Sequence, residues 1–184
     1  MSEGEVDTIF NTLFYDISFD LNNFTTFDIA GDDASWDLTE TNGITEAFID
    51  VGRTTSNKDW LISSQINLPN DYQNFYLNFS HALRYENDFV KDYFKLYVSD
   101  NYDGSDPEAA NWSEITFTWQ GTYKSGFFDV SWLDLSAYKG KDIHIAFIFD
   151  YPDDLDFYYT TWKIKNIQIF GINAVRIPDQ KLNI

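Results

Sequence analysis

The chain has 184 residues, a length that fits one domain, and 43% of them are hydrophobic, so a full core is possible. Its 30 acidic and 12 basic residues give a formal net charge of -18, which argues against a nucleic-acid partner because such a partner requires a basic surface. The absence of cysteine excludes disulfides, thiolate catalysis and cysteine-based zinc sites. The acidity is compatible with cation binding, and equally with solubility alone.

The N-terminal stretch MSEGEVDTIF has neither the basic nor the apolar region of a signal peptide. No apolar run approaches the roughly 20 residues of a membrane span. The residues alone therefore predict either an intracellular protein or a chain whose targeting segment has been removed.

Alternation of apolar and polar residues, the signal of a β-strand, recurs along the chain. Four shorter pieces come first: LFYDISF, FTTFDI, ITEAFIDV and DWLISSQI. Four clearer ones follow: YQNFYLNFSHAL, DYFKLYVSD, SEITFTW and DIHIAFIFD. The last of these is apolar on both faces, which is typical of a central strand.

Segments rich in Gly, Pro, Asn and Asp separate these pieces. No window predicts a long helix, although SWLDLSAYKG could form one short helical turn. Eight to ten short strands joined by loops predict an all-β fold, an antiparallel two-sheet jelly-roll β-sandwich. We expect residues 1–184 to form this single domain, with residues 172–184 as a C-terminal extension.

The stretch TTWKIKNIQIFG near the C-terminal end alternates and then changes phase. Trp162 and Ile164 lie two residues apart, but the next apolar residue is Ile167, three residues further on. This slip predicts a β-bulge at Lys165-Asn166, because one extra residue in a strand moves the following side chains to the opposite face.

Nothing in the sequence positions a catalytic set. Of the two histidines, His81 falls on the apolar face of its predicted strand, which favours a hydrogen-bonded core residue. His144 faces away from the main apolar stripe of its strand and has no motif around it. Two histidines also argue against a histidine-based catalytic zinc site. Paired carboxylates could serve a glycosidase, but 30 acids supply such pairs in any arrangement.

Two acidic loops are candidate calcium sites, since calcium takes six to eight oxygen ligands from carboxylates and loop carbonyls. The loop FDIAGDDASW contains Asp28, Asp32 and Asp33. The loop SDNYDGSDPE contains Asp100, Asp103, Asp106 and Glu108. Neither matches the EF-hand pattern, and Asp and Asn also stabilise turns without any metal, so both interpretations stay open.

An aromatic loop is the candidate ligand-binding segment. The stretch YPDDLDFYYTTW contains Tyr151, Phe157, Tyr158 and Tyr159. Exposed aromatic residues in a loop are candidates for recognition of a sugar or a protein. The alternative is that these rings cover one end of the sandwich core.

Five segments resemble, in order and spacing, a known family. They are DWLISSQINL, LNFSHALRYEN, KLYVSDNYDGSDPEAANWSEIT, DLSAYKGKDIHIAFIF and TTWKIKNIQI. With the upstream LFYDISFDLNNFTTFDIAGDDASWD, the match runs from about residue 13 to residue 171. The chain resembles the choice-of-anchor J, or cleaved adhesin, domain of secreted Bacteroidetes proteins, whose members include adhesin modules of gingipain-type proteases.

The resemblance implies a jelly roll like that of MAM domains and carbohydrate-binding modules. It also implies export, and binding or adhesion in place of catalysis. In such folds calcium often sits where the first strand, the acidic loop and the last strand meet. Carried over by position, its ligands would come from Asp16, from Asp28, Asp32 or Asp33, and from a last-strand motif Trp-x-Ile-Asp-Asn.

This chain departs from that motif, because Lys165 stands where the family has aspartate. We expect the Lys165 ammonium to replace calcium and to pair with Asp16 or an acid of the 28–33 loop. Calcium remains a candidate cofactor. The second acidic loop, with Asp100, Asp103 and Asp106, is a separate candidate site.

The sequence therefore predicts a secreted or cell-surface, non-catalytic binding or adhesion module for a glycan or a surface protein. One alternative is a structural accessory domain of a larger surface protein, with no small ligand of its own. Another is a glycoside hydrolase. An exposed aromatic platform would favour the first, a surface without a cleft the second, and two carboxylates about 5–9 Å apart in a cleft the third.

Overall fold

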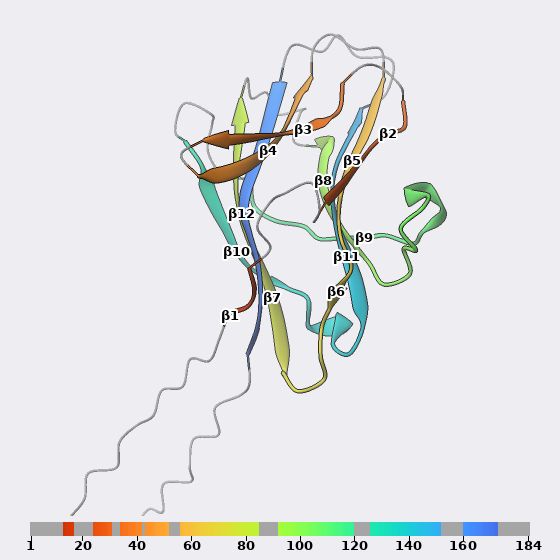
Figure 1. Cartoon of the computed structure of the whole chain (residues 1–184), viewed down its shortest axis with the longest axis vertical. Helices are drawn as coiled ribbons and strands as arrows, with labels where there is room; N and C mark the ends of the chain where they lie inside the picture. The colour runs from red at the N-terminus through yellow and green to blue at the C-terminus, as the bar shows by residue number, and fades with distance from the viewer. Residues whose placement is uncertain are drawn as a thin grey trace, which may run out of the picture.

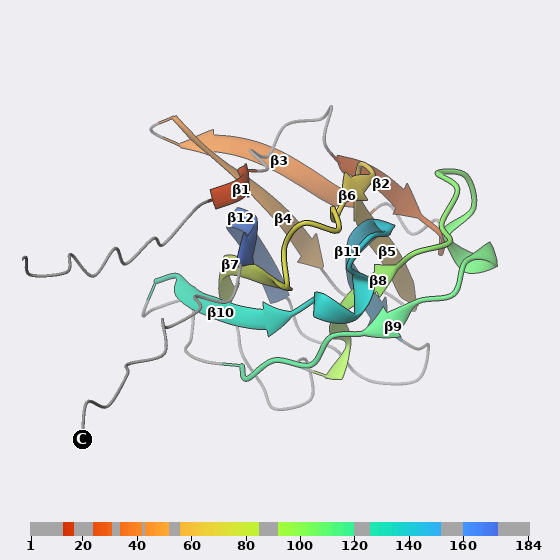
Figure 2. The same ribbon diagram turned by 90° about the horizontal axis from the view of Figure 1, so that it is seen from below.

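The protein is described by a computed structural model that covers residues 13–16, 24–30, 34–41, 43–51, 56–84, 92–119, 126–151 and 160–172. These residues form two antiparallel six-stranded sheets packed as a sandwich (Figures 1 and 2). The predicted all-β, two-sheet jelly roll is confirmed. The short 3-10 helix at Ser136–Tyr138 lies in the segment predicted to form one helical turn.

Sheet 1 has the strand order β10-β7-β12-β4-β3, and β1 also pairs with β12. Its strands are β1 (Leu13–Asp16), β3 (Trp36–Thr41), β4 (Ile44–Val51), β7 (Asn74–Arg84), β10 (Phe128–Asp134) and β12 (Thr160–Ile172). The predicted C-terminal extension was to begin at residue 172, but Ile172 is the last residue of β12 and pairs with Asn74. Residues 173–184 lie outside the described part of the chain.

Sheet 2 has the strand order β2-β5-β11-β8-β9, and β6 also pairs with β11. Its strands are β2 (Phe24–Asp28), β5 (Asn57–Ser63), β6 (Ile66–Asn67), β8 (Phe94–Ser99), β9 (Ser113–Glu114) and β11 (Asp142–Tyr151). The central strand β11 is buried on both faces, as its two apolar stripes predict.

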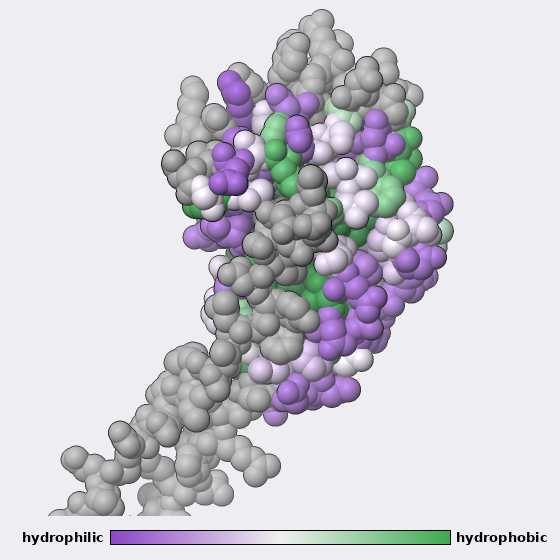
Figure 3. Space-filling model, viewed as in Figure 1, coloured by the Kyte–Doolittle hydropathy of each residue, from purple (hydrophilic) through white to green (hydrophobic). Residues whose placement is uncertain are grey.

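The core lies between the sheets and is dominated by aromatic rings. Trp162 of β12 is fully buried and contacts Phe94 of β8 and Phe147 of β11, with ring centroids 4.8 Å and 5.7 Å away. Large rings bury much apolar surface, and tilted or edge-on pairs gain about 0.5–1.5 kcal/mol beyond that burial. The surface is mostly hydrophilic in the view of Figure 3, with smaller apolar patches, as the composition predicts.

A second apolar cluster lies on the outer face of sheet 2, where residues 100–112 fold over it. Trp60, Ile62 and Ile148 are buried there. Tyr102 and Trp112 of the covering loop pack against them, and the Trp60 and Trp112 ring centroids are 5.2 Å apart. The loop contains a second 3-10 helix, Pro107–Ala109, whose N-terminal amide is capped by Asp106. The chain thus covers this face with its own residues.

The predicted bulge in β12 is confirmed. The register between β12 and β7 shifts between Lys165 and Gln168. Asn166 has φ 53°, a left-handed conformation that Asn tolerates better than most residues. The shift lets Ile164 and Ile167 both lie in the core, which is the reason for the phase slip in the sequence.

A second bulge, which the sequence analysis did not predict, lies in β10. The register between β10 and β7 shifts between Val130 and Leu133, and Trp132 has φ 65°. The two bulges therefore flank β7 on its two sides, opposite residues 77–80.

The segment SEITFTW is a strand for only two residues, so the longer predicted strand is wrong. Ile115 N–H donates to the Leu96 carbonyl at 2.8 Å, and the following residues leave the sheet. The rings of Phe117 and Trp119 pack against Phe79 and Trp162 of sheet 1. The alternation of this segment therefore buries rings across the edge of the sandwich. We call residues 115–119 the crossing segment.

Candidate binding surface

The outer face of sheet 1 is the surface formed by the outward side chains of β4, β12, β7 and β10. In β7 these side chains alternate with the buried core residues Phe75, Leu77 and Phe79. Figure 2 shows β3 and β4 on one side of β7 and β12, and β10 on the other.

Three aromatic side chains gather on this face, and we call Tyr76, Trp132 and Phe170 the aromatic cluster. Trp132 is 60% exposed, the largest exposure among the large hydrophobic residues of the described chain. Its ring centroid lies 5.3 Å from that of Tyr76 and 5.1 Å from that of Phe170, both edge-on. Tyr76 and Phe170 are register partners on β7 and β12. Two strands thus support one exposed ring.

The bulge in β10 is what aims Trp132 outward. Its φ of 65° is rare for a residue with a β-carbon and costs roughly 1–2 kcal/mol. Its backbone N–H donates to the Asn78 side-chain oxygen at 2.8 Å, which fixes the bulge. Strained backbone of this kind persists where the surrounding structure holds it and is concentrated at functional sites.

Polar side chains continue the surface along β7 and β12. The Ser80 hydroxyl donates to Asp129 at 2.7 Å and accepts from the Asn166 amide at 3.2 Å. Because Lys165 is the register partner of Ser80, this group lies beside the β12 bulge. It presents amide, hydroxyl and carboxylate groups on the same sheet face as the aromatic cluster, further along β7.

Two lysines of β12 share one carboxylate on this face. The ammonium groups of Lys163 and Lys165 lie 3.2 Å and 3.6 Å from Glu46 of β4. The Lys165 ammonium also lies 3.6 Å from the centroid of the Phe127 ring, a cation–π contact. The described partner of Lys165 is thus Glu46 on the neighbouring strand. The expected pairing of Lys165 with Asp16 or an acid of the 28–33 loop stays a prediction, because the Asp16 side chain and residues 31–33 lie outside the described part of the chain.

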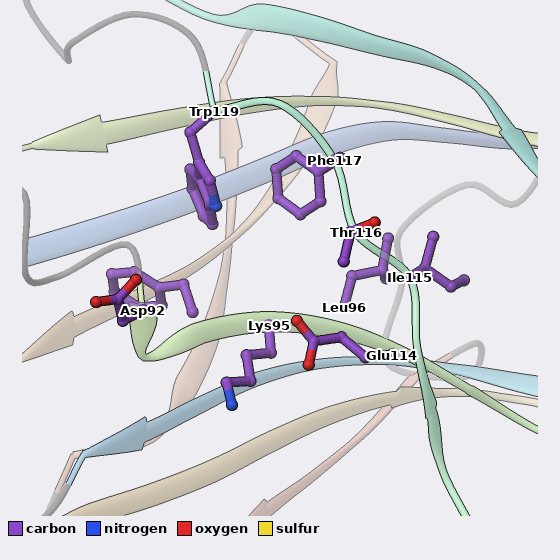
Figure 4. Close-up of a pocket in the computed structure, with 9 residues that line it drawn as sticks. Asp92, Lys95, Leu96, Glu114, Ile115, Thr116, Phe117 and Trp119 are labelled. Atoms are coloured by element: carbon purple, nitrogen blue, oxygen red, sulfur yellow. The ribbon is translucent and has the colours of Figure 1, made fainter.

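A pocket of about 380 Å³ opens at the edge of sheet 2, between β8 and the crossing segment, and we call it the edge pocket (Figure 4). Its lining residues are Asp92, Phe94, Lys95, Leu96, Glu114, Ile115, Thr116, Phe117 and Trp119. Figure 4 shows the Phe117 and Trp119 rings directed from the crossing segment toward β8. The pocket thus has an aromatic wall and a charged rim.

His81 lies in the core behind this wall. It is fully buried, with its ring centroid 5.0 Å from that of Trp119 and 5.7 Å from that of Phe117. Burial lowers the pKa of His81 to about 4. Its core position is as predicted, but neither ring nitrogen has a hydrogen-bond partner among the described residues, so the predicted hydrogen bond is not found.

Two residues of the predicted family calcium site, Asp16 and Asp28, lie on different sheets. Asp16 of β1 pairs in register with Gln168, just beyond the β12 bulge. Asp28 of β2 pairs in register with Asp59 in sheet 2. Asp32 and Asp33 lie outside the described residues. Within the part of the chain that the structure describes, no three His, Asp or Glu side chains form a group that could hold a metal.

The acids of the second loop have contacts within the protein. Asp100 forms an ion pair with Lys141, which holds the pKa of Asp100 below its usual value. Asp103 accepts hydrogen bonds from the hydroxyl and backbone N–H of Ser105, which lower its pKa too. Glu108 pairs with Lys58. These contacts, with the cap at Asp106, are those that shape the loop covering sheet 2.

The predicted aromatic loop is described only at its first residue. Tyr151 ends β11, is 2% exposed, and packs against Tyr93 with ring centroids 4.8 Å apart. A sugar has no access to a ring buried in this way, so Tyr151 covers the core, as the alternative interpretation stated. Phe157, Tyr158 and Tyr159 lie outside the described residues.

Sequence reasoning missed the aromatic cluster, although a signal was present. In FDVSWLDL, the inward residues Val130 and Leu133 are three positions apart, the same phase slip that marks the bulge in β12. Trp132 falls within that slip. A search for interrupted alternation would have selected it.

Known protein structures share this fold. The family 11 carbohydrate-binding module of a cellulosomal cellulase from Clostridium thermocellum is similar with a TM-score of 0.51 and 9% identity, over 89% of this chain and 95% of that one. The same type of module, solved with a β-1,3-1,4-mixed-linked tetrasaccharide, has a TM-score of 0.51 and 10% identity, over 88% of this chain and 96% of that one.

A cleaved adhesin domain of Lys-gingipain from Porphyromonas gingivalis has a TM-score of 0.50 and 16% identity, over 82% of this chain and 91% of that one. No protein-family model matches the sequence. No curated protein sequence matches it significantly. At these identities the likeness shows the fold, a jelly roll like that of carbohydrate-binding modules. In the described chain, no helix is long and apolar enough to cross a membrane.

Proposed function

We propose that this chain is a non-catalytic glycan-binding module of a secreted or surface-displayed protein, related to the choice-of-anchor J or cleaved adhesin domains. The observation that carries the proposal is Trp132, which is 60% exposed on a strained bulge and supported by two other rings. The C–H face of a sugar ring packs on an aromatic face, while its hydroxyls require hydrogen-bond partners. The outer face of sheet 1 offers both.

The polar groups on the same face of sheet 1 as the aromatic cluster suit the recognition of hydroxyls. Asp129 supplies an acceptor and Asn166 supplies both a donor and an acceptor, while Lys163, which is bonded to the buried Glu46, supplies a donor. Their bonds to Ser80 and to each other fix their orientation before any ligand arrives, which lowers the entropic cost of binding. This arrangement supports binding, and the proposal assigns no proton transfer to it.

The proposal also includes Lys165 as a substitute for the family's calcium. Its ammonium neutralises Glu46 beside the β12 bulge without any metal. Calorimetric titration with calcium is expected to show no binding that depends on this position, and Lys165→Asp is expected to create such binding. Strong calcium binding by the wild type that is lost on changing Glu46 or Asp16 would contradict this substitution.

A glycan array tests the main proposal, with β-1,3-1,4-mixed-linked glucan among the probes and with calcium and chelator arms. The wild type is expected to bind at least one glycan. Trp132→Ala is expected to lower that affinity by about tenfold or more, a loss typical of a central aromatic anchor. The matched control is Ile29→Ala, another exposed apolar side chain, which directly follows β2 of the other sheet and should leave binding unchanged.

Two results would overturn the proposal. One is the absence of binding to any glycan, which would favour the structural accessory domain or a protein partner. The other is a bound glycan whose affinity Trp132→Ala does not change. Release of reducing sugar from a bound glycan would favour the glycoside hydrolase alternative.

A further inference from the structure

The edge pocket exists because a segment with the sequence of a strand does not pair as one. Ile115 donates to the Leu96 carbonyl, and beyond it the crossing segment departs from β8. Its rings turn inward to the core, and the space between its backbone and β8 remains open (Figure 4). The pocket is therefore bordered by the unpaired part of an edge strand.

The backbone of β8 directs hydrogen-bonding groups toward this space. The Tyr93 carbonyl accepts from Asp150 at the end of β11, whereas the Leu96 carbonyl accepts from Ile115 on the opposite side. Backbone groups of an antiparallel strand alternate between its two neighbours. Phe94 therefore presents its N–H and C=O to the pocket, where no described strand pairs with them.

The rim of the pocket carries charges that are not used elsewhere. Asp92, Lys95 and Glu114 form no ion pair or side-chain hydrogen bond within the described chain, and none of the three is fully enclosed. Elsewhere, by contrast, lysines meet carboxylates: Lys58 with Glu108, Lys141 with Asp100, and Lys163 and Lys165 with Glu46. The two carboxylates, which accept hydrogen bonds, and the Lys95 ammonium, which donates them, thus line the pocket without partners in the described chain.

This combination fits a neutral ligand rich in hydroxyls. A hydroxyl both donates and accepts, so it can bond to a carboxylate, an ammonium group or a free backbone group. Phe117 and Trp119 supply the apolar wall that the C–H face of a sugar needs. The volume of about 380 Å³ is near the lower end of the range for ligand pockets, roughly 300–1,000 Å³, which suits one or two sugar units and excludes a long chain.

We propose that the edge pocket is a second glycan-binding site, which takes the terminal sugar unit of a chain. The inference rests on the proposed function and extends it. The aromatic cluster lies on an open sheet face and binds the side of a glycan, whereas the pocket binds its end. The two sites use different sheets and different aromatic residues, so each can be removed separately.

The test compares a pocket variant, Asp92→Ala with Glu114→Ala, with a matched control that removes two other exposed acids, Glu40→Ala with Asp71→Ala. The probes are the glycans that the wild type binds on the array, each as a short oligosaccharide and as the long polymer, measured by calorimetry. The pocket variant is expected to lose about fivefold or more of its affinity for short oligosaccharides, because the terminal sugar unit is a larger part of a short chain than of a long polymer. It should keep most of its affinity for long polymers.

The control pair should match the wild type on every probe, and Trp132→Ala should show the opposite pattern, with the larger loss on long polymers. If Trp132→Ala weakens binding and the pocket variant binds every glycan as the wild type does, the second site is refuted while the proposed function stands. If the wild type binds no glycan, the proposed function fails and the second site fails with it. Circular dichroism checks that each variant is folded.

Discussion

The outer faces of the two sheets differ in what covers them. On sheet 2, Trp60 is 5% exposed beneath Tyr102 and Trp112 of the covering loop. On sheet 1, Trp132 is 60% exposed and is held outward by a bulge. Both tryptophans point away from the main core, yet the chain buries one with its own residues and leaves the other at the surface. An exposed ring that the chain supports but does not cover is available to a ligand.

Polar contacts hold the cover of sheet 2 in place. The Trp112 indole N–H donates to the Pro107 carbonyl at 2.8 Å within the loop. Ion pairs join the loop to the sandwich at two points, from Glu108 to Lys58 and from Asp100 to Lys141. Several acids of the loop predicted as a calcium site thus fasten that loop to the sandwich.

The largest loss of stability is expected from removing the tryptophan that lies under the covering loop of sheet 2. Trp60→Ala removes a buried indole beneath the loop and should lower the free energy of unfolding by about 3–5 kcal/mol. Urea unfolding measures this loss. Glycan affinity of the folded variant should be unchanged, because Trp60 lies on the other sheet. A loss below about 1 kcal/mol would show that the loop does not cover this face in solution.

The pH dependence of the free energy of unfolding tests the burial of His81, which lies on β7 of sheet 1. The pKa of His81 falls from 6.5 to about 4 on folding, so the unfolded state binds more protons between these values. The free energy of unfolding therefore has its full contribution from neutral His81 above pH 6.5. It falls by up to about 3 kcal/mol as the pH is lowered through 4. His81→Phe should remove this part of the pH dependence. If the free energy of unfolding depended on pH with the same slope in the variant and the wild type, the conclusion that His81 is buried in its neutral form would be wrong.

A smaller effect is expected at the exposed tryptophan. Trp132→Gly should be more stable than Trp132→Ala by about 1 kcal/mol, because glycine adopts a φ of 65° without strain. Both variants lack the ring, so their difference in urea unfolding isolates the backbone. Equal stability of the two variants would mean that the bulge at Trp132 stores no strain. The strain could then not be taken as a sign that the bulge serves to expose the ring.

The smallest effect is expected from one ion pair of the cover. Glu108→Ala breaks an exposed contact with Lys58 and should lower the free energy of unfolding by less than about 1 kcal/mol. The difference from the wild type should shrink in 1 M salt, which screens exposed charges. A loss as large as that of Trp60→Ala would mean that charge, not ring packing, holds the cover.

The fold could be predicted from the sequence because alternation reports the two faces of a strand directly. The same alternation predicted the bulge in β12, since Ile164 and Ile167 both belong to the core. It did not predict β3, whose residues WDLTET carry few apolar side chains. It also mistook the crossing segment for a strand, because rings that pack across the sandwich edge alternate as strand residues do.

The candidate site was harder to predict for a physical reason. Alternation shows that Trp60 points away from the core, but not that residues 100–112 fold back over it, since that contact joins parts of the chain far apart in sequence. Tyr151 was a candidate for an exposed ring, whereas Trp132 was not among the predicted site residues. Tyr151 is buried at the end of β11, and Trp132 is exposed by a bulge whose phase slip in FDVSWLDL was not interpreted from the sequence.

The most direct measurement of the central claim is the two-dimensional NMR spectrum of the indole N–H groups. The chain has six tryptophans, and single Trp→Phe variants assign the signals of Trp132 and Trp60. On titration with the glycan that binds best on the array, the account predicts that the Trp132 signal shifts with a saturable dependence while the Trp60 signal stays in place. A glycan that binds without moving the Trp132 signal, or the absence of any bound glycan, would contradict it.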